Sequence, residues 1–181
     1  MKDSFEKKAW HRLFRHVSFL LAVEAVIVTL LSYYTAFYFS QYYGFQLPQA
    51  AGLWCAISGI VVLQVTIDDS IKAGWFRILG SFLGALSSFI FTCFFGFTIL
   101  ALACSMFLTV ILASSCKIKH IARLACLTSQ VIIIVGMIAG NVTPWAAASA
   151  RFIESAVGIV IAIAVSSLFF PLRKKMRLLD H

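Results

Sequence analysis

Long apolar stretches alternate with short polar or basic segments along most of this chain. An α-helix rises 1.5 Å per residue, so about 20 apolar residues cover the ~30 Å hydrocarbon core of a bilayer. The pattern therefore predicts membrane-spanning helices over Val17–Phe39, Ala50–Thr66, Leu124–Gly140 and Arg151–Phe170. The polar segment Ile67–Phe76 is predicted to be a loop between two of the spans.

The longest apolar stretch, Arg77–Ser115, predicts a hairpin of two further spans. One straight helix of this length would extend about 60 Å, twice the hydrocarbon core. The turn is expected near Phe95–Phe97, around Gly96, and Pro171 is expected to end the last span. The fold class that follows is an all-α, integral membrane bundle of six helices.

Composition places the chain among multi-pass membrane proteins. It is 61% hydrophobic and 12% charged, with a mean hydropathy of +0.95, whereas soluble domains are about 45–50% apolar and about 25% charged. One membrane domain, residues 17–171, is expected between a basic N-terminal segment, residues 1–16, and a basic tail, residues 172–181. The net charge of +8 comes from residues at the span ends, which indicates lipid head groups and topology rather than nucleic acid.

The basic residues divide unevenly between the two predicted faces of the membrane. With six spans, 14 of the 15 Lys and Arg residues fall on one side, and Arg151 alone falls on the other. An excess of Lys and Arg marks the cytoplasmic side, so both termini are expected there. Residues 1–16 fit either a short amphipathic helix on the membrane surface or a plain positive flank.

A pattern of small residues after an arginine occurs twice, as R-x2-[GE]-x3-G-x3-[SA]. It begins at Arg77 in the third predicted span and at Arg151 in the sixth. The two copies are three spans apart and so run in opposite directions, as in the 3+3 inverted repeats of transporters. Small residues at this spacing are also common wherever helices pack closely, so both interpretations remain open. The residues expected to pack are Gly80, Gly84 and Gly158, within the chain or in a homodimer.

Enzyme motifs are absent from the sequence, which has no Gly-rich phosphate loop, no HExxH and no nucleophile elbow. All four histidines lie in basic flanks, and the five cysteines are scattered without paired spacing. We therefore expect no catalytic activity, no metal and no cofactor.

Four charged residues are predicted at membrane depth: Glu24, Arg77, Arg151 and Glu154. Charge is costly there, so it generally faces a cavity, a partner or the bundle interior. Arg77 is either an interfacial anchor or part of a binding site. Arg151 either pairs with Glu154 structurally or supplies positive potential at an external mouth. Glu24 is either a buried partner of a basic residue or a proton-coupling group.

Two polar-capable residues of the second span are further candidates. Trp54 lies five residues into that span, deeper than the aromatic belt at a membrane interface, and is able to line a pocket for a flat ligand. Gln64 lies near the other end of the span. Both are candidates for contact with a transported molecule.

Two stretches resemble the aromatic acid exporter family, also called fusaric acid resistance-like membrane domains, and the related aluminium-activated malate transporters. WCAISGIVVLQVTIDDSIKAGWFRILGSFLG, residues 54–84, is similar to that family's second-span tryptophan and the following R-x2-G-x3-G. RFIESAVGIVIAIAVSSLFFPLR, residues 151–173, is similar to its closing R-x2-acidic-x3-G segment. The resemblance implies a six-span unit that exports organic anions, typically aromatic carboxylates, from a bacterial cytoplasmic membrane.

The sequence-based hypothesis is thus a transporter for small organic anions, in which Arg77 and Arg151 mark the cytoplasmic and external mouths. Arginine binds carboxylate bidentately, which suits both residues to the cargo. The chain has one six-span unit where many members of the family have two, so assembly into a homo-oligomer is expected. An uncoupled anion channel and a non-transporting membrane subunit or scaffold are the alternatives.

Overall fold

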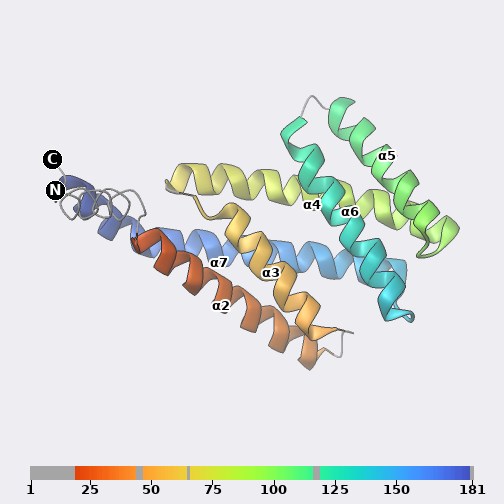
Figure 1. Cartoon of the computed structure of the whole chain (residues 1–181), viewed down its shortest axis with the longest axis horizontal. Coiled ribbons are helices and arrows are strands. Elements are labelled where there is room, and N and C mark those ends of the chain that lie inside the picture. Colours follow the sequence, from red (N-terminus) through yellow and green to blue (C-terminus); the bar gives the residue numbers. More distant parts are fainter. Residues whose placement is uncertain (1–18, 44–46, 65, 116–118, 180–181) are drawn as a thin grey trace, which may run out of the picture.

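The protein is described by a computed structural model that covers residues 19–43, 47–64, 66–115 and 119–179. Within these ranges the chain forms six helices and the all-α prediction is confirmed (Figure 1). They are α2 (Phe19–Tyr42), α3 (Pro48–Val62), α4 (Ile67–Phe95), α5 (Ile99–Ser115), α6 (Lys119–Ala139) and α7 (Pro144–Leu179). The predicted N-terminal segment, residues 1–16, lies outside the described residues.

The hairpin predicted within Arg77–Ser115 is confirmed. Helix α4 ends at Phe95, and Gly96 has φ 66°, a left-handed backbone conformation that favours glycine. After two more residues α5 begins and returns along α4.

The loop predicted over Ile67–Phe76 is wrong, because α4 begins at Ile67. Thr66 is the N-cap: its hydroxyl accepts a hydrogen bond from the Asp69 backbone N–H and donates one to the Asp69 carboxylate. Asp68 and Asp69 both lie in the first turn, where negative charge favours the helix dipole. The polar residues thus start the helix instead of interrupting it.

The limits of the last span also differ from the prediction. Helix α7 begins at Pro144, seven residues before Arg151, and Pro is well tolerated at a first helical position. It then continues past Pro171 to Leu179. Proline removes one backbone hydrogen bond, and helices in membranes tolerate this, so Pro171 does not end the helix as predicted.

Four helices, α2, α4, α6 and α7, are long and apolar enough to cross a membrane. Helices α3 and α5 are shorter, at 15 and 17 residues, or about 22 and 25 Å. They are apolar throughout, and α3 buries mostly small residues against its neighbours. The chain is therefore a multi-pass membrane protein with four long and two short apolar helices.

Helices α4 and α7 lie side by side in opposite directions and form the centre of the bundle (Figure 1). Helices α2 and α3 pack against each other and against α7, while α5 and α6 pack against each other and against α4. The central helix α4 is thus covered by the later hairpin α5–α6, and the central helix α7 is covered by the earlier hairpin α2–α3.

Glycines allow the closest helix crossings. A Cβ on Gly84 of α4 would overlap the carbonyl oxygen of Ala125 in α6, and a Cβ on Gly158 of α7 would overlap that of Cys55 in α3. Because the overlapping atoms are backbone, no side-chain movement could make room. The two crossings fix α6 on α4 and α3 on α7.

The interior of the bundle contains both apolar and polar contacts. Between α2, α3 and α7 an apolar cluster includes Val28, Val62 and Ile159, which are fully or almost fully buried. Between α4, α5 and α6, buried hydroxyls bond across the helices: Ser129 joins Ser88 at 2.9 Å and Ser105 at 2.7 Å, and Ser87 joins Thr109 at 2.6 Å.

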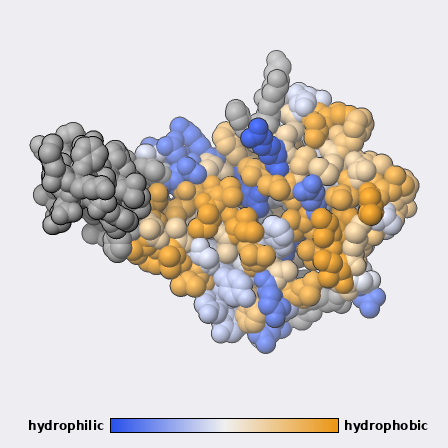
Figure 2. All heavy atoms as spheres, in the orientation of Figure 1, coloured by the Kyte–Doolittle hydropathy of each residue, from blue (hydrophilic) through white to orange (hydrophobic). Residues whose placement is uncertain are grey.

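The outward faces are apolar, as expected for contact with lipid. Figure 2 shows mostly hydrophobic residues on the viewed face, with fewer hydrophilic ones between them. Large apolar side chains are exposed on all six described helices, among them Tyr38, Leu53, Phe82, Phe107, Ile138 and Leu168.

Candidate functional site

A partly open cavity of about 260 Å³ lies where α3 and α6 flank the central pair α4 and α7. We call it the arginine chamber. Its lining residues come from four helices: Trp54, Ile57 and Val61 of α3, Arg77 of α4, Leu127, Thr128 and Val131 of α6, and Arg151 and Ser155 of α7. A water occupies about 30 Å³, so the volume is large enough for a small organic molecule.

Arg77 is held in this chamber by a serine of the neighbouring helix. Its side chain is only 5% exposed, and its Nε and Nη2 donate hydrogen bonds to Ser58 Oγ at 3.3 and 3.0 Å. Ser58 Oγ in turn donates to Ser155 Oγ at 3.5 Å. This network ties α4 to α3 and α7 at the level of the arginine.

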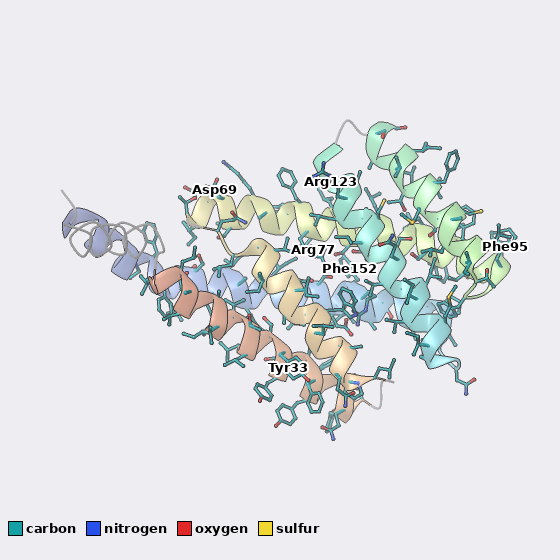
Figure 3. All side chains as sticks on the ribbon, in the orientation of Figure 1. Tyr33, Asp69, Arg77, Phe95, Arg123 and Phe152 are labelled. Carbon is teal, nitrogen blue, oxygen red and sulfur yellow. The ribbon has the colours of Figure 1, made fainter. Side chains whose placement is uncertain are left out.

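Arg77 lies inside the bundle, and not at the membrane interface or at a separate cytoplasmic mouth. The residue lies near the middle of α4, between Asp69 at the start and Phe95 at the end (Figure 3), about 15 Å along the helix from Ile67. It is buried and hydrogen-bonded, so it is not an interfacial anchor. Arg77 and Arg151 line the same chamber, so they do not mark two opposite mouths.

Arg151 contacts two other candidate site residues at once, its predicted partner Glu154 and Trp54. Its Nη2 forms an ion pair with the Glu154 carboxylate, one turn further along α7. Its Cζ lies 5.7 Å from the centre of the Trp54 ring, in cation–π contact. Nη1 of Arg151 is buried and has no hydrogen-bond partner among the described residues.

A second cavity, of about 270 Å³, lies where α6 and α7 meet. We call it the end cavity. Its wall includes Ser40 of α2, the turn Asn141–Thr143, and Arg151 and Glu154. Arg151 thus lines both the end cavity and the arginine chamber, while Glu154 lines only the end cavity.

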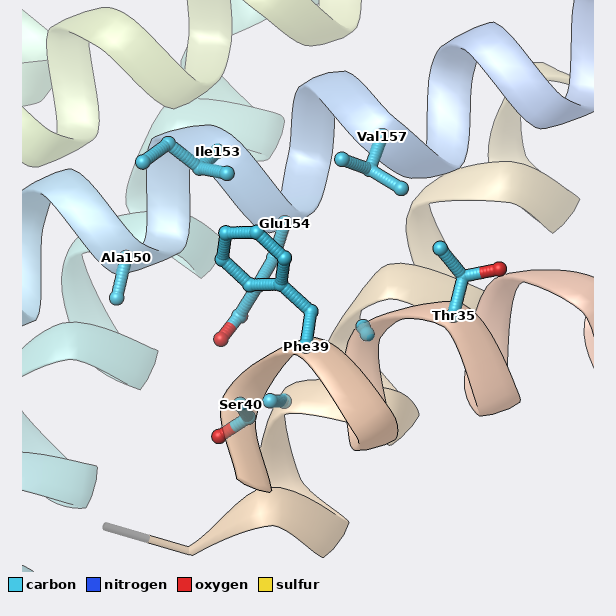
Figure 4. A pocket seen from close by; sticks show the side chains of 9 residues that line it. Thr35, Phe39, Ser40, Ala150, Ile153, Glu154 and Val157 are labelled. Atoms are coloured by element: carbon cyan, nitrogen blue, oxygen red, sulfur yellow. The ribbon is translucent and has the colours of Figure 1, made fainter. Parts of the chain in front are cut away.

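Glu154 also borders a small pocket of about 50 Å³ between α7 and α2. In Figure 4 its side chain points from α7 toward α2, where Phe39 and Ser40 lie close by. Thr35 lines the same pocket. Ser40 Oγ is buried and has no hydrogen-bond partner among the described residues.

The chamber joins positive charge to apolar walls. Two buried arginines face it, and the nearby Glu154 neutralises one of them, which leaves an excess of positive charge. Ile57, Val61, Leu127 and Val131 supply aliphatic surface, and Trp54 supplies an aromatic face. A planar guanidinium next to an aromatic ring suits a flat molecule that carries a carboxylate.

The remaining predicted site residues lie elsewhere. Gln64 follows the end of α3 and bonds its amide to the Val61 carbonyl, outside both cavities. Glu24 is fully buried in α2 and lines neither cavity. Gly80 lies at a close contact of α4 with Leu124 of α6.

Three polar lining or bridging residues were missed by sequence reasoning: Ser58, Ser155 and Thr128. Serine and threonine are common in membrane helices, so each is uninformative alone. A signal was nevertheless present in the spacing. Ser58 lies four residues after Trp54, and Ser155 lies four residues after Arg151, so each pair shares one helix face.

Across the part of the chain that the structure describes, no three His, Cys, Asp or Glu side chains gather as metal ligands.

Comparison with protein families gives one result. A family model described as fusaric acid resistance protein-like matches residues 32–165, which include α3 to α6 entirely, the second half of α2 from Ser32 onward, and most of the apolar part of α7. No curated protein and no solved structure shows a significant match to this chain.

Proposed function

The chain belongs to the fusaric acid resistance protein-like family, and from this premise we propose that it exports small organic anions, with aromatic carboxylates as cargo. The family is one of efflux transporters, generally non-enzymatic membrane proteins. The observation that carries the proposal is the arginine chamber, in which two buried arginines and Trp54 face one cavity. Buried positive charge of this kind marks a ligand or ion pathway in a membrane protein.

The two cavities suggest how cargo passes through the bundle. Arg151 lines the end cavity on one side and the arginine chamber on the other. A carboxylate that leaves Arg77 therefore meets the next guanidinium before it reaches the turn at Asn141. Two cationic stations allow release from the first as contact with the second forms, which conduction requires.

The packing supports a 3+3 inverted repeat with α2–α4 as one half and α5–α7 as the other. Helix α3 lies on α7 as α6 lies on α4, and α2 lies on α7 as α5 lies on α4. The arginines that begin the repeated sequence pattern, Arg77 and Arg151, meet where the two halves cross. Binding at the interface of inverted repeats is the common arrangement in secondary transporters.

We further propose a homo-oligomer in the bacterial inner membrane, with both termini cytoplasmic. The arginine chamber is bordered by Ile57 and Leu127, whose side chains are 36% and 52% exposed on α3 and α6. A chamber with charged walls and an edge at the lipid-facing surface is better closed by a second copy than by lipid.

Glu24 is the proposed proton-coupling group, because it is a fully buried carboxylate within a spanning helix.

The test is flux of labelled benzoate and of an aliphatic carboxylate, malate, in proteoliposomes, with and without a pH gradient. We expect gradient-dependent benzoate flux that falls at least about tenfold in Arg77→Gln and in Arg151→Gln, because each variant loses a charge-assisted contact with the carboxylate. Lys72→Gln is the matched control, because Lys72 is an exposed basic residue outside both cavities.

Other outcomes would change the assignment. Benzoate flux that does not depend on the pH gradient would favour an uncoupled anion channel. No flux of any carboxylate from well-folded protein would overturn transport and favour a subunit or scaffold. Equal flux in wild type and Arg151→Gln would remove Arg151 from the pathway.

A further inference from the structure

We infer that Glu154 is a tethered competitor anion: it occupies Arg151 when cargo is absent, and a cargo carboxylate must displace it to pass between the two cavities. This inference rests on the proposed transport function and adds a gate to it. The gate is the exchange of one carboxylate for another on a single guanidinium.

The first observation is where the two partners lie. Arg151 lines both cavities, whereas Glu154 lines only the end cavity and the small pocket beside α2. The ion pair is therefore made on the end-cavity side of Arg151. Cargo in the arginine chamber approaches the same guanidinium from its other side, where Trp54 covers it.

The second observation is the unused capacity of Arg151. Nη1 has no hydrogen-bond partner among the described residues, although the side chain is only 9% exposed. A buried N–H without a partner is costly, and a carboxylate accepts hydrogen bonds best when two guanidinium N–H groups face it. An arriving carboxylate can thus bond Nη1 first and then take Nη2 from Glu154.

The third observation is a place for the displaced carboxylate. The small pocket between α7 and α2 lies beside Glu154 and includes Thr35 and Ser40. Ser40 Oγ is buried without a hydrogen-bond partner among the described residues, so its O–H is available to donate to a carboxylate. Glu154 therefore has a polar contact available on α2 when it releases Arg151.

The other arginine has no such competitor. Position 80, which corresponds to Glu154 in the repeated pattern, is glycine, and Arg77 donates instead to the neutral hydroxyl of Ser58. A cargo anion at Arg77 displaces no charge, so the exchange step belongs to Arg151 alone. The gate is consequently one-sided, between the arginine chamber and the end cavity.

The experiment is equilibrium binding of benzoate to the full chain in lipid nanodiscs, followed by Trp54 fluorescence in a background where the other three tryptophans are phenylalanine. Benzamide, the uncharged isostere, is the ligand control. We expect Glu154→Gln to bind benzoate about tenfold or more tightly than wild type, because the competing charge is gone. Asp68→Asn, an exposed acid-to-amide change, should leave the affinity unchanged.

Glu154→Asp covers the case in which Glu154→Gln does not fold. Its shorter side chain keeps the charge but reaches Arg151 less well, so benzoate affinity should rise above that of wild type. Equal or weaker benzoate binding in the folded Glu154 variant would overturn the gate alone. Absence of benzoate binding in wild type and in every variant would overturn the proposed function and the gate together.

Discussion

The Ser58 hydroxyl lies at the centre of the contacts that orient Arg77. It accepts hydrogen bonds from two nitrogens of that guanidinium and donates to Ser155 on the opposite helix. A long, flexible arginine side chain loses much rotamer freedom when it is fixed. A short serine on a rigid helix restrains the arginine without adding a competing charge to the chamber.

Ser58→Ala should therefore raise the KM for benzoate several-fold in the flux assay. The change leaves Arg77 Nε and Nη2 without their acceptor, at a cost of about 1–3 kcal/mol, and the guanidinium no longer faces the chamber in one orientation. Ser167→Ala is the control, because Ser167 is exposed and bonds only within its own helix. An unchanged KM in folded Ser58→Ala would show that Arg77 is positioned by other contacts.

Sequence reasoning identified the charged and aromatic members of the chamber but not their arrangement. Arg77, Arg151 and Trp54 stand out because such residues are rare at membrane depth. That the two arginines share one cavity depends on the α4–α7 crossing, which no local pattern specifies. The prediction for Gln64 rests on its polarity alone, and the residue lies past the end of its helix.

At the scale of whole helices, the crossing of α7 with α3 depends on a single missing side chain. Gly158 lies against the backbone of Cys55, where even a methyl group would overlap the carbonyl oxygen. Gly84 has the same relation to Ala125 between α4 and α6. These crossings set the distance between the helices that carry Trp54 and Arg151.

Gly158→Ala should lower the thermal unfolding midpoint of the protein in nanodiscs. The added methyl forces α3 and α7 apart, and overpacking of this kind costs about 1–3 kcal/mol. Gly84→Ala should have a similar effect on α4 and α6. Ala164→Leu, on the exposed face of α7, adds more carbon atoms and should leave the midpoint nearly unchanged. A midpoint in Gly158→Ala equal to wild type would mean that the crossing is looser than described.

Helix existence was easier to predict than helix ends. The six apolar stretches are long, so their type is clear, and glycine at position 96 marks a turn. The polar segment after Thr66 was read as a loop because it interrupts the apolar pattern, although Thr66 and Asp69 match the N-cap signature of a helix start. Pro171 lies inside α7, since one lost hydrogen bond does not end a long helix.

For the whole molecule, the uneven distribution of basic residues leads to a topology prediction. In a variant with all five cysteines replaced by alanine, a cysteine at position 141 should react with a membrane-impermeant maleimide added outside intact cells. A cysteine at position 68 should react only after the membrane is opened. Both positions are exposed. Labelling of position 68 from outside would contradict cytoplasmic termini.

The packing of each hairpin on the central helix of the other half, α2–α3 on α7 and α5–α6 on α4, has a consequence for biosynthesis. Helices α2 and α3 leave the ribosome early, but α7, the central helix they cover, begins about 80 residues after α3 ends. At about 5–20 residues per second, this first hairpin waits on the order of ten seconds in the bilayer before its partner is made. Arg77 likewise enters the membrane long before Arg151 and Ser155. The chamber is therefore a product of the completed chain, and a protein truncated before its last helix would present an unfinished polar surface to lipid and to quality-control proteases.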